Sequence, residues 1–153
     1  MERTLTAETT EKVGKEVKLA GWVDTKRDHG KMVFVDLRDR GGMVQVVGGS
    51  ELSSLRPEDV VEIDGKVSER PEKLVNSKIP TGKVEVKASK VKVLAKAKDL
   101  PFPIDDEGND IEESLRLKYR YLDLRRPRLQ RNLKVRHQVI QKIRDFLSAQ
   151  DFI

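Results

Sequence analysis

The chain has 153 residues, of which 37% are hydrophobic and 37% charged, and its formal net charge is +5. It has no cysteine and only two histidines, which excludes disulfides and thiolate metal sites and leaves too few histidines for a zinc site. No apolar run approaches the ~20 residues of a membrane helix and the first residues lack a signal peptide's apolar segment, so we expect a cytoplasmic protein without membrane contact.

Five segments alternate apolar and polar residues, which predicts strands with one buried face. The glycines at 41 and 42 favour a tight turn between the second and third strands. Ser50 is the expected N-cap of a short helical turn, and residues 70–82 carry the prolines and glycine of a long loop. The apolar phase slips between Val86 and Val91, which indicates a bulge. The strands are expected over residues 16–26, 31–38, 43–47, 60–69 and 83–94.

A short helix between the third and fourth of five strands is typical of the OB-fold barrel. We therefore predict a mainly β protein, a five-stranded OB-fold barrel followed by a hinge and a C-terminal α-helix. In this fold the face of strands two and three and the connecting loops bind oligonucleotides. The strand count by itself also fits other five-stranded barrels.

The character of the chain changes after Leu100. Residues 105–113 carry six acids and no base, and are interpreted as a solvated linker. Residues 116–144 carry eleven bases and one acid, Asp123. Such clustered positive charge indicates a polyanionic partner, the alternative being a solvated helix face. From Arg128 the apolar period becomes helical and predicts a helix that needs something to pack on; we expect that the chain is part of a longer protein.

The strand at 31–38 places an aromatic ring on its polar side. Phe34 alternates with Val33, Val35 and Leu37 and therefore shares its face with Asp36. Pairing across the predicted turn puts Phe34 near Gln45, and the polar face of the fifth strand, expected to border the first, carries Glu85. A ring stacks on any base, and amide and carboxylate groups recognise base edges. Phosphate contacts are expected from the loop before this strand, at Lys26, Arg27, His29 and Lys31.

These assignments compete with plainer ones. The ring of Phe34 could be covered by the loop 70–82, and Gln45 and Glu85, each taken alone, fit ordinary surface residues. No catalytic constellation, glycine-rich phosphate loop or metal-ligand spacing is visible, so we expect no catalytic residue and no metal site in this chain.

Four stretches together closely resemble the N-terminal region of bacterial aspartyl-tRNA synthetases, class II enzymes. They are VKLAGWV, RDHGKMVFVDLRDRGGMVQVV, IPTGKVEV and LRLKYRYLDLRRP. The Phe-x-Asp-x-Arg-Asp pattern is shared with the lysyl and asparaginyl enzymes of the same subgroup. The resemblance implies an anticodon-binding domain over residues 1–100, a linker and hinge over 101–127, and the first helix of a truncated catalytic domain over 128–153.

The resemblance also implies roles for individual residues. Phe34 would stack on an anticodon base, Gln45 would read the middle base and Glu85 the first. Arg27 would touch the anticodon loop. His29 occupies a position that tends to be leucine in strictly specific members, which favours charging of asparagine tRNA as well as aspartate tRNA. The hinge arginines would lie near the tRNA stem: Arg120, Arg125 and Arg126.

The whole enzyme would ligate aspartate to tRNA with ATP and Mg, as a homodimer formed through the missing catalytic domain, and this chain alone would be inactive. The alternatives are a lysyl or asparaginyl enzyme, a non-enzymatic OB module for single-stranded nucleic acid, and a structural barrel that holds a partner through its last helix.

Overall fold

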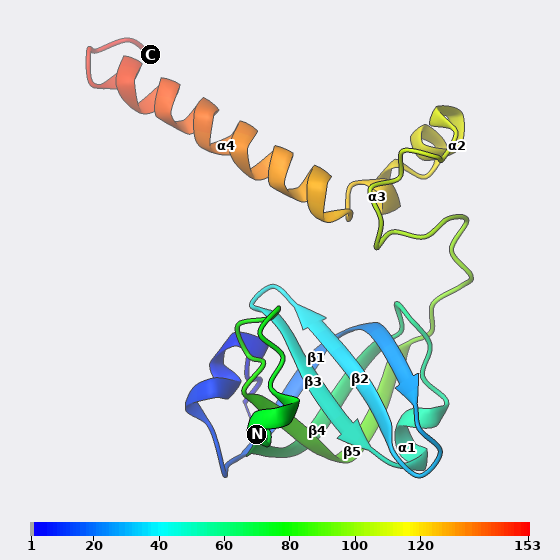
Figure 1. Ribbon diagram of the computed structural model, residues 1–153. Coiled ribbons are helices and arrows are strands. Elements are labelled where there is room, and N and C mark those ends of the chain that lie inside the picture. The colour runs from blue at the N-terminus through cyan, green and yellow to red at the C-terminus, as the bar shows by residue number, and fades with distance from the viewer. Residues whose placement is uncertain (1) are drawn as a thin grey trace. The chain divides into compact units, whose positions relative to one another are not determined.

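The computed structural model describes residues 2–153, which form two compact units (Figure 1). The first unit ends at Lys98, and the second runs from Asp99 to Ile153.

The first unit is a closed barrel of five strands in the order β1-β2-β3-β5-β4. β3 and β5 pair in parallel and the other neighbours are antiparallel. The barrel confirms the predicted fold class. The expectation that the fifth strand borders the first was wrong, because β5 lies between β3 and β4. The strands are β1 (Glu16–Asp28), β2 (Val33–Asp39), β3 (Gly42–Gly48), β4 (Val60–Glu69) and β5 (Val84–Ala95).

Alternation along each strand builds the barrel core. In β2 the side chains of Val33, Val35 and Leu37 are completely buried, whereas Phe34 is half-buried and 14% of the Asp36 side chain is exposed. The predicted proximity of Phe34 and Gln45 is confirmed by the pairing of β2 with β3, in which Phe34 lies opposite Val47 and Asp36 opposite Gln45. The predicted bulge in β5 is also confirmed: Lys90 pairs with Asp64 and Ala88 with Gly65, so that Ser89 is the extra residue.

Two short helices carry residues that complete the barrel. The helix α1 (Ser50–Ser53) contributes Leu52, which is buried with Leu55 in the core. Gly49, not Ser50, occupies the N-cap position of α1, so the predicted cap was wrong by one residue. The 3-10 helix η1 (Thr6–Glu11) is fastened to the end of β2, where the Thr6 backbone N–H and hydroxyl donate to Asp39 at 2.9 and 2.6 Å.

The loop after β4 is more ordered than its composition indicates. It contains a 3-10 turn, η2 (Glu72–Leu74). The Thr81 hydroxyl donates to the Met43 carbonyl and so ties the end of the loop to β3. Phe34 lies across from Val47, four residues from Met43, and its ring contacts His29 instead. These contacts favour the solvent-facing interpretation of Phe34 over a ring covered by this loop.

The second unit contains three helices: α2 (Glu113–Lys118), α3 (Arg120–Asp123) and α4 (Pro127–Ser148). Pro127 is the first residue of α4, a position where its missing N–H costs no helical hydrogen bond. The helix therefore begins one residue before its predicted start. Of the apolar residues that give this segment its helical period, Leu129 is buried, whereas Leu133, Ile140 and Ile143 are exposed.

Candidate nucleic-acid interface

A ladder of hydrogen bonds crosses the outer face of four strands. The Thr25 hydroxyl on β1 donates to Asp36 on β2 at 2.7 Å. The guanidinium of Arg27 donates to the other oxygen of Asp36 at 2.9 Å and to the side-chain carbonyl oxygen of Gln45 on β3 at 3.3 Å. The side-chain amide N–H of Gln45 in turn donates to Glu85 on β5 at 3.0 Å. Three of the predicted binding residues, Arg27, Gln45 and Glu85, therefore form one connected polar strip.

A bulge in β1 places Arg27 on this face. Val23 pairs with Leu37, but the next pair joins Thr25 to Asp36, so Asp24 is an extra residue. Because side chains alternate along a strand, unbroken alternation from Val23 would have turned Arg27 toward the barrel interior. The bulge reverses the phase and puts Arg27 opposite Phe34. This bulge was not predicted, since the residues around Asp24 are polar and carry no phase signal.

Phe34 lies beside the ladder with His29. Their ring centroids are 5.5 Å apart and the rings are nearly perpendicular, at 86°. His29 is exposed in the turn between β1 and β2, where its backbone N–H donates to the backbone carbonyl of Met32 at 2.9 Å. The half-exposed ring of Phe34 therefore has one edge contact, and such a ring is suited to stacking on a base.

Gln45 and Glu85 differ from expectation in their surroundings. Gln45 was expected on an open surface, but its neighbours leave only 6% of it exposed. Glu85 reaches it from β5 through the parallel pairing of β3 and β5, not from a strand next to β1. A base edge that binds here must therefore exchange hydrogen bonds with a preformed pair, and the two residues lie close enough to act on adjacent groups.

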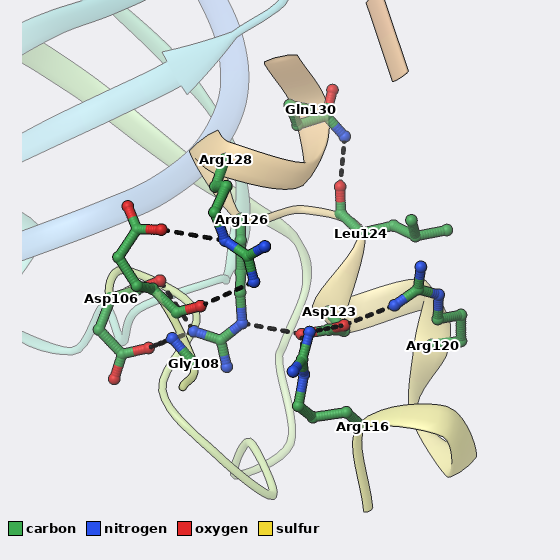
Figure 2. A network of polar contacts seen from close by, with 10 residues as sticks. Asp106, Gly108, Arg116, Arg120, Asp123, Leu124, Arg126, Arg128 and Gln130 are labelled. Atoms are coloured by element: carbon green, nitrogen blue, oxygen red, sulfur yellow. Dashed lines mark hydrogen bonds and ion pairs between the residues drawn. The ribbon is translucent and has the colours of Figure 1, made fainter. Parts of the chain in front are cut away.

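The hinge is organised around a buried carboxylate. Asp123 is completely buried and accepts hydrogen bonds from three arginines, with Arg120 at 2.7 Å, Arg126 at 2.9 Å and Arg116 at 3.1 Å (Figure 2). Burial by itself raises the pKa of Asp123, but hydrogen bonds from Arg116 and Arg126 outweigh it and hold the pKa below its ordinary value. Asp123 is therefore a charged structural centre.

Arg126 is part of this centre and not of the surface. It is completely buried, pairs with both Asp123 and Asp106, and lies 5.3 Å from the Phe102 ring centroid. Gly108, at φ +69°, allows this close approach, since a Cβ there would come within 2.6 Å of the guanidinium. The burial and pairing of Arg126 therefore favour a structural role over the predicted contact with nucleic acid.

The acidic linker is also not simply solvated. Asp106 pairs with Arg126, and Glu107 lies 3.0 Å from the Arg128 guanidinium. Of the other predicted hinge residues, Arg120 is exposed while bonded to Asp123, and Arg125 is half-buried. The hinge thus presents fewer free cations than its sequence indicates.

Within residues 2–153, no three His, Cys, Asp or Glu side chains are grouped so that they could hold a metal ion. In the same part of the chain, no helix has the length and hydropathy needed to cross a membrane.

The barrel and its ladder define a class of protein, the OB-fold domains that bind nucleic acid through the face of β2 and β3. The chain belongs to the family described as OB-fold nucleic acid binding domain, whose model matches residues 17–94. Residues 112–153 match a second family model, tRNA synthetases class II (D, K and N). The resemblance inferred from the four sequence stretches is thereby confirmed.

Curated relatives carry the name aspartate–tRNA(Asp/Asn) ligase. The protein from Halothermothrix orenii is 45% identical over 152 residues, which cover 94% of this chain and 26% of the relative. The protein from Moorella thermoacetica is 50% identical over 151 residues, covering 94% and 25%. This chain therefore spans about a quarter of the length of these relatives.

Solved structures show the same fold. Asparaginyl-tRNA synthetase from Pyrococcus horikoshii, complexed with asparaginyl-adenylate, matches with a TM-score of 0.77 and 29% identity, over 98% of this chain and 35% of that one. Aspartyl-tRNA synthetase from Entamoeba histolytica matches with a TM-score of 0.85 over 100% of this chain and 38% of that one. At 21% identity, this second likeness concerns the fold alone.

Proposed function

We propose that this chain is the anticodon-binding part of an aspartate–tRNA ligase, and that its tRNA partner is aspartate tRNA. The observation that carries the proposal is the Arg27–Gln45–Glu85 strip beside the half-exposed ring of Phe34. An aromatic platform next to an amide and a carboxylate provides stacking and edge recognition together.

The four side chains have different tasks, which follow from their chemistry. Phe34 stacks on one anticodon base irrespective of its identity. Gln45, which has both donor and acceptor groups, reads the middle base, and Glu85 accepts hydrogen bonds from the first base. The positively charged guanidinium of Arg27 binds the nucleotide backbone, and its ion pair with Asp36 holds it in position.

The hinge has a reduced role in this proposal. Arg120 and Arg125 contact the tRNA backbone, and Arg126 holds the hinge together. The helix α4 is the first helix of the catalytic domain. The whole enzyme uses ATP and Mg, and it is a homodimer.

Binding of stem-loop RNAs tests the proposed function. Wild-type chain should bind the aspartate anticodon stem-loop more tightly than a loop altered at the middle base, because a base-edge contact contributes ~1–3 kcal/mol of discrimination, roughly 5- to 150-fold. Gln45→Ala should reduce that preference and retain binding.

Three results would contradict the assignment. A preference for a lysine or asparagine anticodon would point to those enzymes. Equal binding of unrelated single strands would indicate a general OB module. An absence of RNA binding would leave the barrel with a structural role.

His29 provides a test of tRNA specificity. The relatives are named for both aspartate and asparagine tRNA, and we propose that this protein shares that relaxed specificity. His29→Leu in the full-length enzyme should raise the charging ratio of aspartate over asparagine tRNA, since it changes the side chain that packs on Phe34. An unchanged ratio of kcat/KM values would remove His29 from the discrimination.

A further inference from the structure

A second row of side chains runs beside the Arg27–Gln45–Glu85 strip and continues around the outside of the closed barrel. The strand pairings place Arg27 opposite Phe34, Phe34 opposite Val47, and Val47 beside Lys87. Lys87 in turn pairs with Lys66 on β4. The inward side chains of Val67 and Val86, each next in sequence to one lysine, fix both lysines on the outside. The row therefore passes from an aromatic ring over an apolar residue to two ammonium groups.

The arrangement of the two lysines is unfavourable for the stability of the fold. Both are exposed, and they lie directly opposite each other in an antiparallel ladder, where like charges are destabilising. Glu16 lies across from Lys66 on β1, yet among the described residues neither lysine makes an ion pair. Elsewhere on the same two strands the opposite charges match, because Lys90 lies opposite Asp64 and Lys92 opposite Glu62.

We propose that Lys66 and Lys87 form a phosphate-binding site that continues the RNA path from Phe34 across β3 to β5 and β4. The proposal rests on the proposed function and extends its contact surface. Lys87 and Lys66 lie two and three strands from Phe34 around the closed barrel. Because neighbouring strands are ~4.8 Å apart and the surface curves, the RNA backbone must follow the barrel over several nucleotides from Phe34 to contact both lysines. Val47, only 5% exposed, lies between the ring and the lysines and has no charge.

The double variant Lys66→Gln with Lys87→Gln tests the site in the full chain. The probe is a fluorescently labelled anticodon stem-loop with the aspartate anticodon, titrated by anisotropy over a series of salt concentrations. The slope of log K against log salt should flatten by about 1.4, since each phosphate contact to a single strand contributes ~0.7. Affinity near 0.1 M salt should fall by about 25-fold, and by the same factor for loops altered at the middle base, because phosphate contacts carry no sequence information.

The matched control is Lys90→Gln with Lys92→Gln, which removes the same charge from another part of the β4–β5 ladder. It should leave the salt slope near the wild-type value. The melting temperature supplies a second contrast: Lys66→Gln with Lys87→Gln should raise it by about 1–5 °C through relief of the like-charge pair, whereas the control should not. The test variant is thus expected to bind RNA more weakly and to have a higher melting temperature than wild type.

The outcomes separate this inference from the proposed function. If wild type prefers the aspartate anticodon and the test variant keeps its salt slope, or if the control flattens the slope equally, the phosphate site is wrong. If wild type shows no anticodon preference but only the test variant loses slope, the site stands as a general RNA contact and the proposed function is wrong.

Discussion

Replacing Phe34 by alanine should weaken binding of every anticodon stem-loop by a similar factor of about 5- to 150-fold, the equivalent of ~1–3 kcal/mol for a lost base–aromatic stack. The ring lies on the outer face of β2, while the core beneath it is formed by Val33, Val35 and Leu37. The change therefore removes a ligand contact and leaves the buried residues in place. Fluorescence anisotropy with the aspartate loop and a middle-base variant measures the factor for each RNA.

Val35→Ala is the matched control, since it truncates the next residue of the same strand on the opposite face. Val35 is completely buried, so its truncation should lower the free energy of unfolding by about 1–3 kcal/mol while binding by the folded protein stays close to wild type. If Phe34→Ala instead melted much earlier and bound normally, the ring would be a core residue and the binding face would lie elsewhere.

Asp123→Asn should disrupt the second unit. The neutral amide cannot balance Arg116 and Arg120, and it would leave the guanidinium of Arg126 buried without its carboxylate partner. Breaking a buried ion pair from one side costs about 3–5 kcal/mol. The exposed Asp110→Asn is the control, because it makes the same chemical change within the acidic linker and should have no measurable effect.

The aromatic residues allow the two units to be followed separately. The only tryptophan, Trp22, lies in the barrel, and the only tyrosines, Tyr119 and Tyr121, lie in the hinge. Asp123→Asn should therefore lose tyrosine near-UV circular dichroism at a lower temperature than wild type and keep the Trp22 fluorescence transition. Unchanged tyrosine melting would show that the buried cluster does not stabilise the hinge.

The lowered pKa of Asp123 gives this contribution a pH dependence. Because the pKa is lower in the folded unit than in the unfolded chain, the stabilisation is present above the ordinary carboxyl pKa, near pH 4. It is lost as the pH falls through the lowered folded value. The tyrosine signal of wild type should decline in that acidic range, and Asp123→Asn should lack this step.

The barrel could be predicted well from the sequence because alternation is a local signal. Val33, Val35 and Leu37 identify the buried face of β2 directly, and the glycine turn at 41–42 sets the pairing with β3. The same alternation is sufficient to place Phe34 on the outer face.

The features that were not predicted are those that local sequence patterns do not determine. The bulge at Asp24 lies among polar residues, so alternation could not reveal the phase change that turns Arg27 outward. The pairing of Glu85 with Gln45 depends on the crossover that inserts β5 beside β3, a long-range feature. In the sequence, Arg126 is one of several cations in a basic segment. Only its packing against Phe102, Gly108 and Asp123 in three dimensions shows that it is buried.

The claim that the outer face of β2, β3 and β5 reads the anticodon is tested most directly by NMR titration of the full chain with the aspartate anticodon stem-loop. We expect the largest chemical-shift changes in the ring of Phe34, the side-chain amide of Gln45 and the backbone around Glu85, with smaller changes when the middle base is altered. Shifts concentrated outside this face, with Phe34 and Gln45 unmoved at saturation, would contradict the account.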